Sequence, residues 1–279
     1  MPICPTRDLT TQDKESATSR PLSLSRLFAL AAGVALLLVG AVAPASRVHA
    51  TAPTARVHAT VPAARHRVSA RVASVVPCPP TYVAIGASDA AGVGANDPAN
   101  ESWPAVIARQ LPRGTHFVDL GVPSITLARA NSVELPVALD ALTPAPSGTC
   151  AARPGLVTVW LAVNDLVART PLDAYAAELQ TLLSTLRART HATVLVGNLP
   201  DLALVPAFRG QDPAGLNAVV AAWNGVIAAT AQRNGARLVD LHSRWRDLAA
   251  HPEYVGADGL HPTMAGYRVL AGLFWRALR

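Results

Sequence analysis

Short apolar runs alternate with longer helical patterns from Thr81 to the end of the chain. The runs are rich in β-branched residues, which predicts strands at Tyr82–Ile85, His116–Asp119, Leu156–Leu161, Thr193–Gly197 and Arg237–Asp240. The segments that follow them predict helices at Trp103–Gln110, Val133–Leu142, Pro171–Thr190, Pro213–Asn234 and Thr263–Leu278. Strands that alternate with helices favour an α/β domain, in which helices cover both faces of a parallel sheet. We expect a three-layer α/β/α, flavodoxin-like fold with five strands in the order 2-1-3-4-5.

Local signals support several of the helix ends. Pro171 and Pro213 suit first helical turns, with Thr170 and Asp212 as the N-caps. Gly235 suits the C-terminal stop of the long fourth helix.

The first 77 residues differ in character from the rest. An uncharged apolar stretch, Leu27–Ala43, follows Arg20 and Arg26, and Val48-His49-Ala50 fits a small-x-small cleavage site. Residues 1–50 therefore predict a secretory signal peptide that is cut after Ala50, with an uncleaved membrane anchor as the alternative. Residues 51–77 are rich in Ala, Arg, Val and Pro, which predicts a disordered basic tether that could lie near a cell surface or membrane. We expect a secreted or extracytoplasmic protein whose folded domain is 78–279.

The charge distribution excludes one class of partner. The whole chain has a formal net charge of +6, but the basic excess lies before residue 78. Basic and acidic side chains are equal in number over 78–279, whereas a nucleic-acid-binding domain needs a basic surface of its own. We therefore expect no nucleic-acid partner, and the sequence leaves the oligomeric state open.

The cysteines agree with export. Cys4 precedes the apolar stretch and would be lost on cleavage, which leaves the pair Cys78 and Cys150. Both precede strands that would be neighbours, so a disulfide is expected, with two unlinked thiols as the alternative. Two separated cysteines without nearby histidines form no metal site, and we expect no metal and no cofactor.

Three candidate functional residues follow three of the predicted strands. Ser88 stands in the turn Gly86-Ala87-Ser88-Asp89 after the first strand, Gly121 follows the second, and Asn164 follows the third. The carboxyl ends of parallel strands meet at one edge of a sheet, where ligands bind in such folds. Each residue taken alone also has an ordinary interpretation as a cap or turn.

The segment Asp258-Gly259-Leu260-His261 supplies the other parts of a nucleophilic site. A serine hydroxyl is a poor nucleophile until an adjacent imidazole takes its proton, and a carboxylate can orient that imidazole. We therefore predict Ser88 as the nucleophile, His261 as the general base and Asp258 as its partner. The backbone N–H groups of Ser88 and Gly121 and the side-chain amide of Asn164 are the predicted oxyanion donors.

These residues resemble the motifs of the SGNH (GDSL-type) hydrolase superfamily. Its four blocks occur here in order, as Gly86-Ala87-Ser88-Asp89, Gly121, Ala162-Val163-Asn164-Asp165 and Asp258-Gly259-Leu260-His261. The resemblance covers residues 81–279 and implies the same flavodoxin-like fold, the same triad and the same oxyanion hole.

Two positions depart from the family pattern. The first block usually reads Gly-Asp-Ser-Leu, but Ala87 replaces the Asp and Asp89 replaces the Leu. The third block usually begins with Gly, where this chain has Ala162. Neither change removes a group that performs a chemical step, although the loss of the first-block Asp removes a supporting hydrogen-bond network and is expected to affect the turnover rate.

The favoured function is that of an exported serine esterase acting on lipid or short acyl esters. The apolar segment 198–208 suits a loop that lines an acyl site, with a plain surface connection as the alternative. A carbohydrate O-acetylesterase or an acyltransferase could use the same site. A catalytically weak, surface-tethered binding module is the alternative from another class, and the retained Ser88, Asn164, Asp258 and His261 argue against it. A nucleotide-binding flavodoxin-like protein would need phosphate-loop residues, and the sequence shows none that fit.

Overall fold

Five parallel strands form the central sheet of the structure, a computed structural model that describes residues 78–143, 155–244 and 250–279. The strands lie in the order β2-β1-β3-β4-β5, which confirms the prediction. Their bounds are Thr81–Gly86 (β1), His116–Asp119 (β2), Leu156–Trp160 (β3), Thr193–Gly197 (β4) and Arg237–Val239 (β5).

The middle of the sheet is apolar and inaccessible to solvent. Every residue of β3 is buried, as is all of β1 after Thr81, as expected for strands that are covered on both faces. In the register of this pair Gly86 lies opposite Trp160. The turns that follow β1 and β3 therefore emerge side by side, at the edge where the sequence predicted the site.

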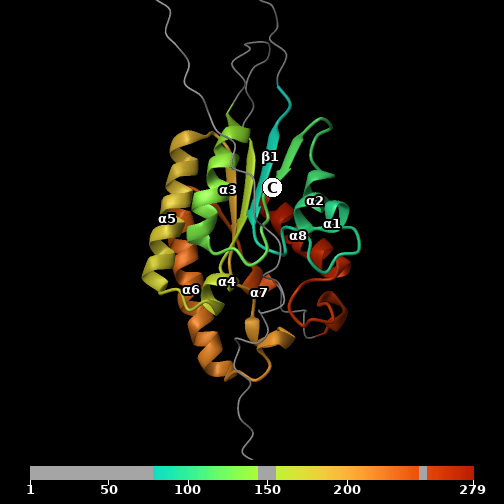
Figure 1. The fold of residues 1–279 in the computed structure, drawn as a ribbon, viewed down its shortest axis with the longest axis vertical. Helices are drawn as coiled ribbons and strands as arrows, with labels where there is room; N and C mark the ends of the chain where they lie inside the picture. Colours follow the sequence, from blue (N-terminus) through green and yellow to red (C-terminus); the bar gives the residue numbers. More distant parts are fainter. Residues whose placement is uncertain (1–77, 144–154, 245–249) are drawn as a thin grey trace, which may run out of the picture. The chain divides into compact units, whose positions relative to one another are not determined.

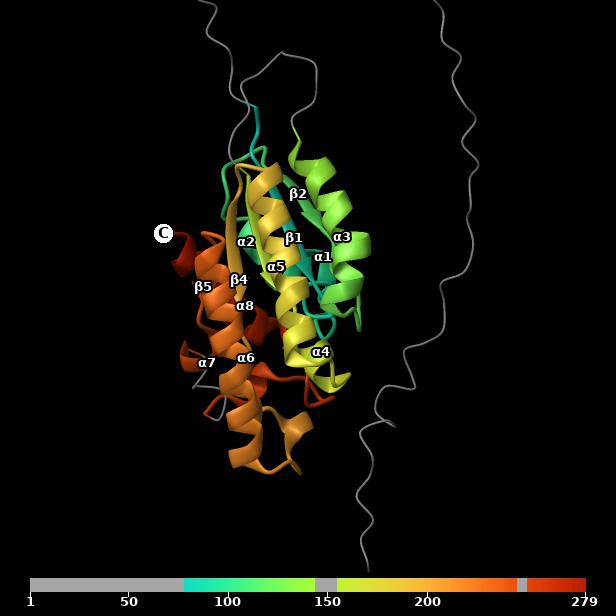
Figure 2. The same ribbon diagram turned by 90° about the vertical axis from the view of Figure 1, so that its left-hand side faces the viewer.

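Helices cover both faces of the sheet (Figure 1). One layer consists of α3 (Leu127–Leu142), α5 (Leu172–Arg189) and α6 (Pro213–Arg233). The opposite layer consists of α1 (Pro98–Glu101), α2 (Trp103–Ala108) and α8 (Met264–Leu278). The view in Figure 2 looks onto the first layer, with α3, α5 and α6 in front of the sheet. Shorter elements complete the connections, namely α4 (Val163–Val167), α7 (Leu241–Arg244), η2 (Leu202–Leu204), η3 (Pro206–Phe208) and η5 (Pro252–Tyr254).

Helix α3 begins six residues earlier than the predicted Val133. Its first N–H, on Leu127, donates to the buried Asp165 Oδ2 at 2.8 Å. Asp165 is 38 residues away in the sequence and thus provides a cap that no local pattern reveals. The helix continues through Pro136, which removes one hydrogen-bond donor without ending it.

The other predicted helix ends are confirmed in two cases out of three. Asp212 caps α6 by accepting from the N–H groups of Ala214 and Gly215, and Gly235 ends it with a φ of 69°. Thr170 is not the cap of α5, because its hydroxyl donates to Asp165 and the helix begins after Pro171.

The predictions for the signal peptide, the tether and Cys150 lie outside the described residues. The expected bridge between Cys78 and Cys150 therefore stays a prediction.

Candidate active site

Ser88 lies in a tight turn directly after β1. The carbonyl of Ser88 accepts from the Val93 N–H at 2.9 Å, and the carbonyl of Ala87 accepts from the Ala91 N–H at 3.0 Å. The turn requires Gly86, because a Cβ at that position would lie 2.6 Å from the Ala90 Cβ. The chain therefore folds back on itself and presents the half-buried Ser88 side chain at the sheet edge.

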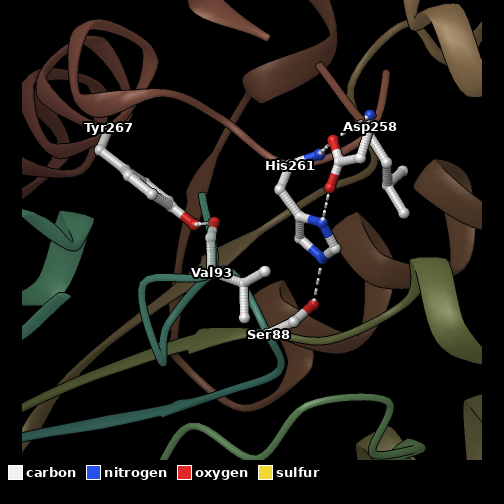
Figure 3. Close-up of polar contacts among 6 residues, drawn as sticks. Ser88, Val93, Asp258, His261 and Tyr267 are labelled. Atoms are coloured by element: carbon white, nitrogen blue, oxygen red, sulfur yellow. Dashed lines mark hydrogen bonds and ion pairs between the residues drawn. The ribbon is translucent and has the colours of Figure 1, made fainter. Parts of the chain in front are cut away.

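The structure brings Ser88, His261 and Asp258 into one hydrogen-bonded series (Figure 3). His261 Nε2 lies 2.8 Å from Ser88 Oγ, although the two residues are 173 positions apart. His261 Nδ1 lies 2.6 Å from Asp258 Oδ2. These are hydrogen-bond distances between the three side chains that the sequence predicted to act together.

Asp258 is held by its own loop. Its Oδ1 accepts from the backbone N–H groups of Leu260 and His261, at 2.9 and 3.0 Å. Burial acts to raise the pKa of Asp258, but the hydrogen bonds from His261 and from these two N–H groups outweigh it and lower the pKa. The carboxylate therefore stays ionised at neutral pH, in the state that can stabilise a positively charged imidazole.

The turn after Ser88 also contacts the loop of His261. The Tyr267 hydroxyl, on α8, donates to the Val93 carbonyl at 2.5 Å (Figure 3). Gly94 has a φ of 95°, and a Cβ there would lie 2.6 Å from the Pro262 carbonyl oxygen. Val93 and Gly94 are thus fixed against the segment that carries His261, so Ser88 and His261 share one support.

Asn164 lies beside them, at the start of α4. Its Nδ2 donates to the Ile125 carbonyl at 2.8 Å, which leaves the second N–H of the amide for another acceptor. Asn164, Ser88 and His261 all line one cavity, as the sequence predicted for residues of one site.

Gly121 does not occupy the predicted position. Its N–H donates to Asp119 Oδ1 at 3.0 Å, and its Cα lies against the backbone of Ala90 and Ala91. The predicted oxyanion donor is therefore already engaged by a side chain two residues before it.

The sequence reasoning missed Ser124. The Ile125 N–H donates to the Val122 carbonyl, which closes a turn with Pro123 and Ser124 at its centre. Ser124 has a φ of 63°, a conformation unusual for a residue other than glycine. Within the described parts of the chain, no protein atom accepts from its N–H. The next residue is Ile125, whose carbonyl accepts from Asn164. The dipeptide Pro123-Ser124 after a strand was the available sequence signal for this turn.

The cavity beside Ser88 is mostly apolar. Besides Ser88, Asn164 and His261, its walls include Trp160, Ala162, Pro200, Leu202, Val205, Val255, Leu260 and Leu270. Pro200, Leu202 and Val205 come from segment 198–208, so this segment lines the site rather than forming a plain surface connection.

Two contacts hold segment 198–208 in place. The Asn224 side chain, on α6, accepts from the Leu199 N–H at 2.8 Å and donates to the Leu199 carbonyl at 3.0 Å. At the other end, the Ala207 N–H donates to the Gly259 carbonyl at 2.8 Å, inside the loop of Asp258 and His261. The wall of the cavity and the loop of Asp258 and His261 are thereby joined.

Metal ligation has no support among the residues that the structure describes. No three His, Cys, Asp or Glu side chains in those ranges are grouped so that they could hold a metal ion.

The sequence matches a family model over residues 84–269, which span the whole site. The chain belongs to the GDSL-like lipase/acylhydrolase family. It is therefore a hydrolase that acts on esters, and the predicted resemblance to this family is confirmed. No curated protein matches the sequence.

Solved structures share the fold of this GDSL-family hydrolase. The structure of TesA has 22% sequence identity and a TM-score of 0.55, with 71% of this chain and 98% of that chain covered. Axe2, an acetylxylan esterase from Geobacillus stearothermophilus, has 17% identity and a TM-score of 0.56, with 73% and 95% covered. A member of the lipolytic G-D-S-L family from Veillonella parvula has 15% identity and a TM-score of 0.54, with 70% and 96% covered. At these identities the likeness shows the fold alone.

The link between Tyr267 and Val93 predicts an effect on turnover. Tyr267→Phe removes the hydroxyl that supports the turn after Ser88, so kcat should fall by about 10-fold, the order expected for one buried hydrogen bond near a reacting group. Steady-state kinetics on a chromogenic ester would measure it.

The matched control is Tyr82→Phe, which removes a buried hydroxyl bond to Thr158 away from the site. Equal kcat values in the two variants would contradict a role of Tyr267 in supporting the turn.

Proposed function

We propose that this GDSL-family hydrolase is a serine esterase that cleaves carboxylic esters with an apolar acyl group through an acyl-enzyme on Ser88. The observation that carries the proposal is the hydrogen-bonded series Asp258–His261–Ser88, which opens onto a cavity with apolar walls.

The first half-reaction uses all three side chains. With the Nδ1 proton of His261 held by Asp258, Nε2 is free to accept the Ser88 proton. Ser88 Oγ attacks the ester carbonyl carbon as this proton moves to Nε2. The bond from that carbon to the alkoxy oxygen then breaks, and the alcohol leaves with the proton from His261.

The second half-reaction releases the acid. Water gives a proton to His261 Nε2 and attacks the acyl carbon, and the carbon–Oγ bond breaks as Ser88 regains its proton. Another alcohol in place of water would make the same site an acyltransferase.

The attack by Ser88 places negative charge on the former carbonyl oxygen. Hydrogen-bond donors that are already in place stabilise this charge. The Ser88 N–H and the second N–H of the Asn164 amide fit this role, since both residues line the cavity. The second backbone donor in the proposal is Ser124 instead of Gly121. Its N–H has no protein acceptor in the described ranges, and its neighbour Ile125 is bound to Asn164.

The cavity indicates the substrate class. Among the described residues, its walls carry one acidic side chain, Asp89, and no Lys or Arg, whereas Trp160, Leu202, Val205 and Leu270 contribute apolar surface. An acyl chain would gain free energy by burial there, and a charged or hydroxylated acyl group would not. This supports lipid or short acyl esters over the acetyl esters of a carbohydrate, the substrate class named for Axe2.

The proposal predicts activity that depends on Ser88 and rises with acyl length. Hydrolysis of chromogenic esters from acetyl to decanoyl should be faster for the longer chains and should fall at least about 10³-fold in Ser88→Ala, because the nucleophile is lost. A preference for acetyl esters would favour the carbohydrate alternative. Equal rates in the parent and in a folded Ser88→Ala protein would contradict the serine mechanism and favour the binding module.

The walls of the cavity predict a change in acyl preference. Val205 is 5% exposed and lines the cavity, so Val205→Phe should shorten the accessible space. We expect kcat/KM for octanoyl esters to fall by about 10-fold relative to acetyl esters. This is the order of the loss when an apolar pocket no longer accommodates a few methylene groups of the substrate. Val219→Phe is the control, since Val219 is 44% exposed on α6. An equal fall for both esters in Val205→Phe would contradict an acyl site.

We also propose that the enzyme works outside the cytoplasm. The apolar stretch 27–43, the basic residues before it and Val48-His49-Ala50 support cleavage after Ala50. The intact mass of the exported protein should match a chain that starts at Thr51, and an exported protein that retains residues 27–43 would instead indicate an anchor.

A further inference from the structure

A group of acidic side chains lies around the nucleophile turn and takes no part in the proposed chemistry. Glu134 comes from α3, Asp119 ends β2, and Asp89 directly follows Ser88. Glu134 accepts from the Gly86 N–H and Asp89 from the Ala90 N–H, while Asp119 accepts from the N–H of Gly121, which packs against Ala90, so the three carboxyl groups surround one turn. Among the described residues, no Lys, Arg or His forms an ion pair with any of them.

Glu134 is the buried member of this group. It is 2% exposed, and its Oε2 accepts from the Gly86 N–H at 3.2 Å. Its Oε1 has no hydrogen-bond partner among the described residues. An acidic side chain at such a place is costly, because its ionised form loses its hydration, and its presence there calls for an explanation.

The position of Glu134 connects it to two parts of the site. Gly86 is the last residue of β1 and lies two residues before Ser88. The Gly86 carbonyl accepts from the Val122 N–H at 3.1 Å, and Val122 begins the turn that contains Ser124. By holding Gly86, Glu134 thus acts on the ends of both β1 and β2, where the nucleophile and the proposed backbone donor leave the sheet.

The turn has little freedom to compensate for the loss of this contact. Gly86 lies so close to Ala90 that a Cβ would meet it at 2.6 Å, and Ala87 is 8% exposed. Ala87 stands where the family pattern has Asp, so residue 87 itself supplies no carboxyl group to this turn.

The charge state of Glu134 agrees with a supporting role. Burial raises its pKa to about 8, the Gly86 and Val122 N–H groups oppose this shift, and the charges of Asp119 and Asp89 add to it. Burial also raises the pKa of the half-buried Asp89. Glu134 is therefore mostly protonated at neutral pH, and it becomes a buried anion beside two other acids as the pH rises through about 8.

We propose that Glu134 is a positioning residue of this hydrolase: from α3 it holds Gly86, and through it fixes Ser88 in line with His261. The inference rests on the proposed role of Ser88. It adds a residue on a different element, 46 positions after the nucleophile in the sequence and outside the cavity lining.

Glu134→Ala tests the contact to Gly86. We expect kcat per active site to fall by about 10- to 100-fold, the scale of a misplacement of reacting groups by up to 1 Å. KM should change less than about 3-fold, because Glu134 does not line the cavity. Active sites are counted by the burst of chromophore released from an organophosphonate ester, so that unfolded protein does not enter kcat.

Glu134→Gln tests the neutral form. The amide keeps an oxygen for the Gly86 N–H and cannot ionise, so kcat at pH 7 should stay within about 3-fold of the parent. Glu134→Leu fills a similar volume without an acceptor, so its kcat per active site should fall as far as that of Glu134→Ala. The contrast between Glu134→Gln and Glu134→Leu tests the proposal if Glu134→Ala does not fold.

The control is Glu178→Gln, which changes a part-buried Glu that binds Asn131 on the neighbouring helix. It should keep the kcat of the parent. An unchanged kcat per titrated site in Glu134→Ala or Glu134→Leu, or equal losses in Glu134→Gln and Glu134→Leu, would overturn the proposal. If the phosphonate does not label Ser88 in the parent protein, the proposed function itself fails, whatever the Glu134 variants show.

Discussion

The hydrogen bond between Ser88 Oγ and His261 Nε2 is the contact on which the account of this site depends. It joins the first strand of the sheet to the loop before the last helix, and no local interaction could bring these segments together. The pairing of β1 with β3 sets the place of Ser88, and the packing of α8 sets the place of His261. Catalysis therefore draws on the stability of the whole domain rather than on the loops alone.

The site is held by rigid contacts on every side. Tyr267 and Gly94 join the turn after Ser88 to the loop of His261, and the Ala207–Gly259 hydrogen bond joins that loop to the cavity wall. Such support fixes reacting groups before the substrate arrives, which is the main structural requirement for nucleophilic catalysis. The buried Glu134 goes against the rule that acids stay at the surface, and such exceptions concentrate at functional sites.

Much of this architecture could be predicted from the sequence. The alternation of apolar runs and helical patterns gave the strand order, because parallel sheets of this kind have few topologies. The grouping of Ser88, His261 and Asp258 could be predicted too, since Asp258 and His261 share a short loop and Ser88 follows a strand. Gly121 was a reasonable candidate by its place after β2, but only coordinates show that Asp119 engages its N–H and that the chain turns further on at Ser124.

The contacts that were missed are long-range and involve single atoms. Asp165 caps α3 from 38 residues away, and Glu134 reaches Gly86 from 48 residues away. Asp165 stands in the third motif block, but the motif does not reveal its partner, and Glu134 belongs to no motif, although it stands out as an acid in the apolar stretch Val133–Leu139. Propensity and periodicity describe neighbours along the chain, so such contacts between elements lie beyond them.

The central claim is that an acyl-enzyme forms on Ser88. It is tested most directly by looking for the acylated peptide during turnover. The protein is mixed with an octanoyl ester, quenched in acid within milliseconds, digested and examined by mass spectrometry. A peptide that carries one octanoyl group on Ser88 should be present during turnover and absent once the substrate is consumed. Turnover without any acylated peptide, or with the acyl group on another residue, would contradict the claim.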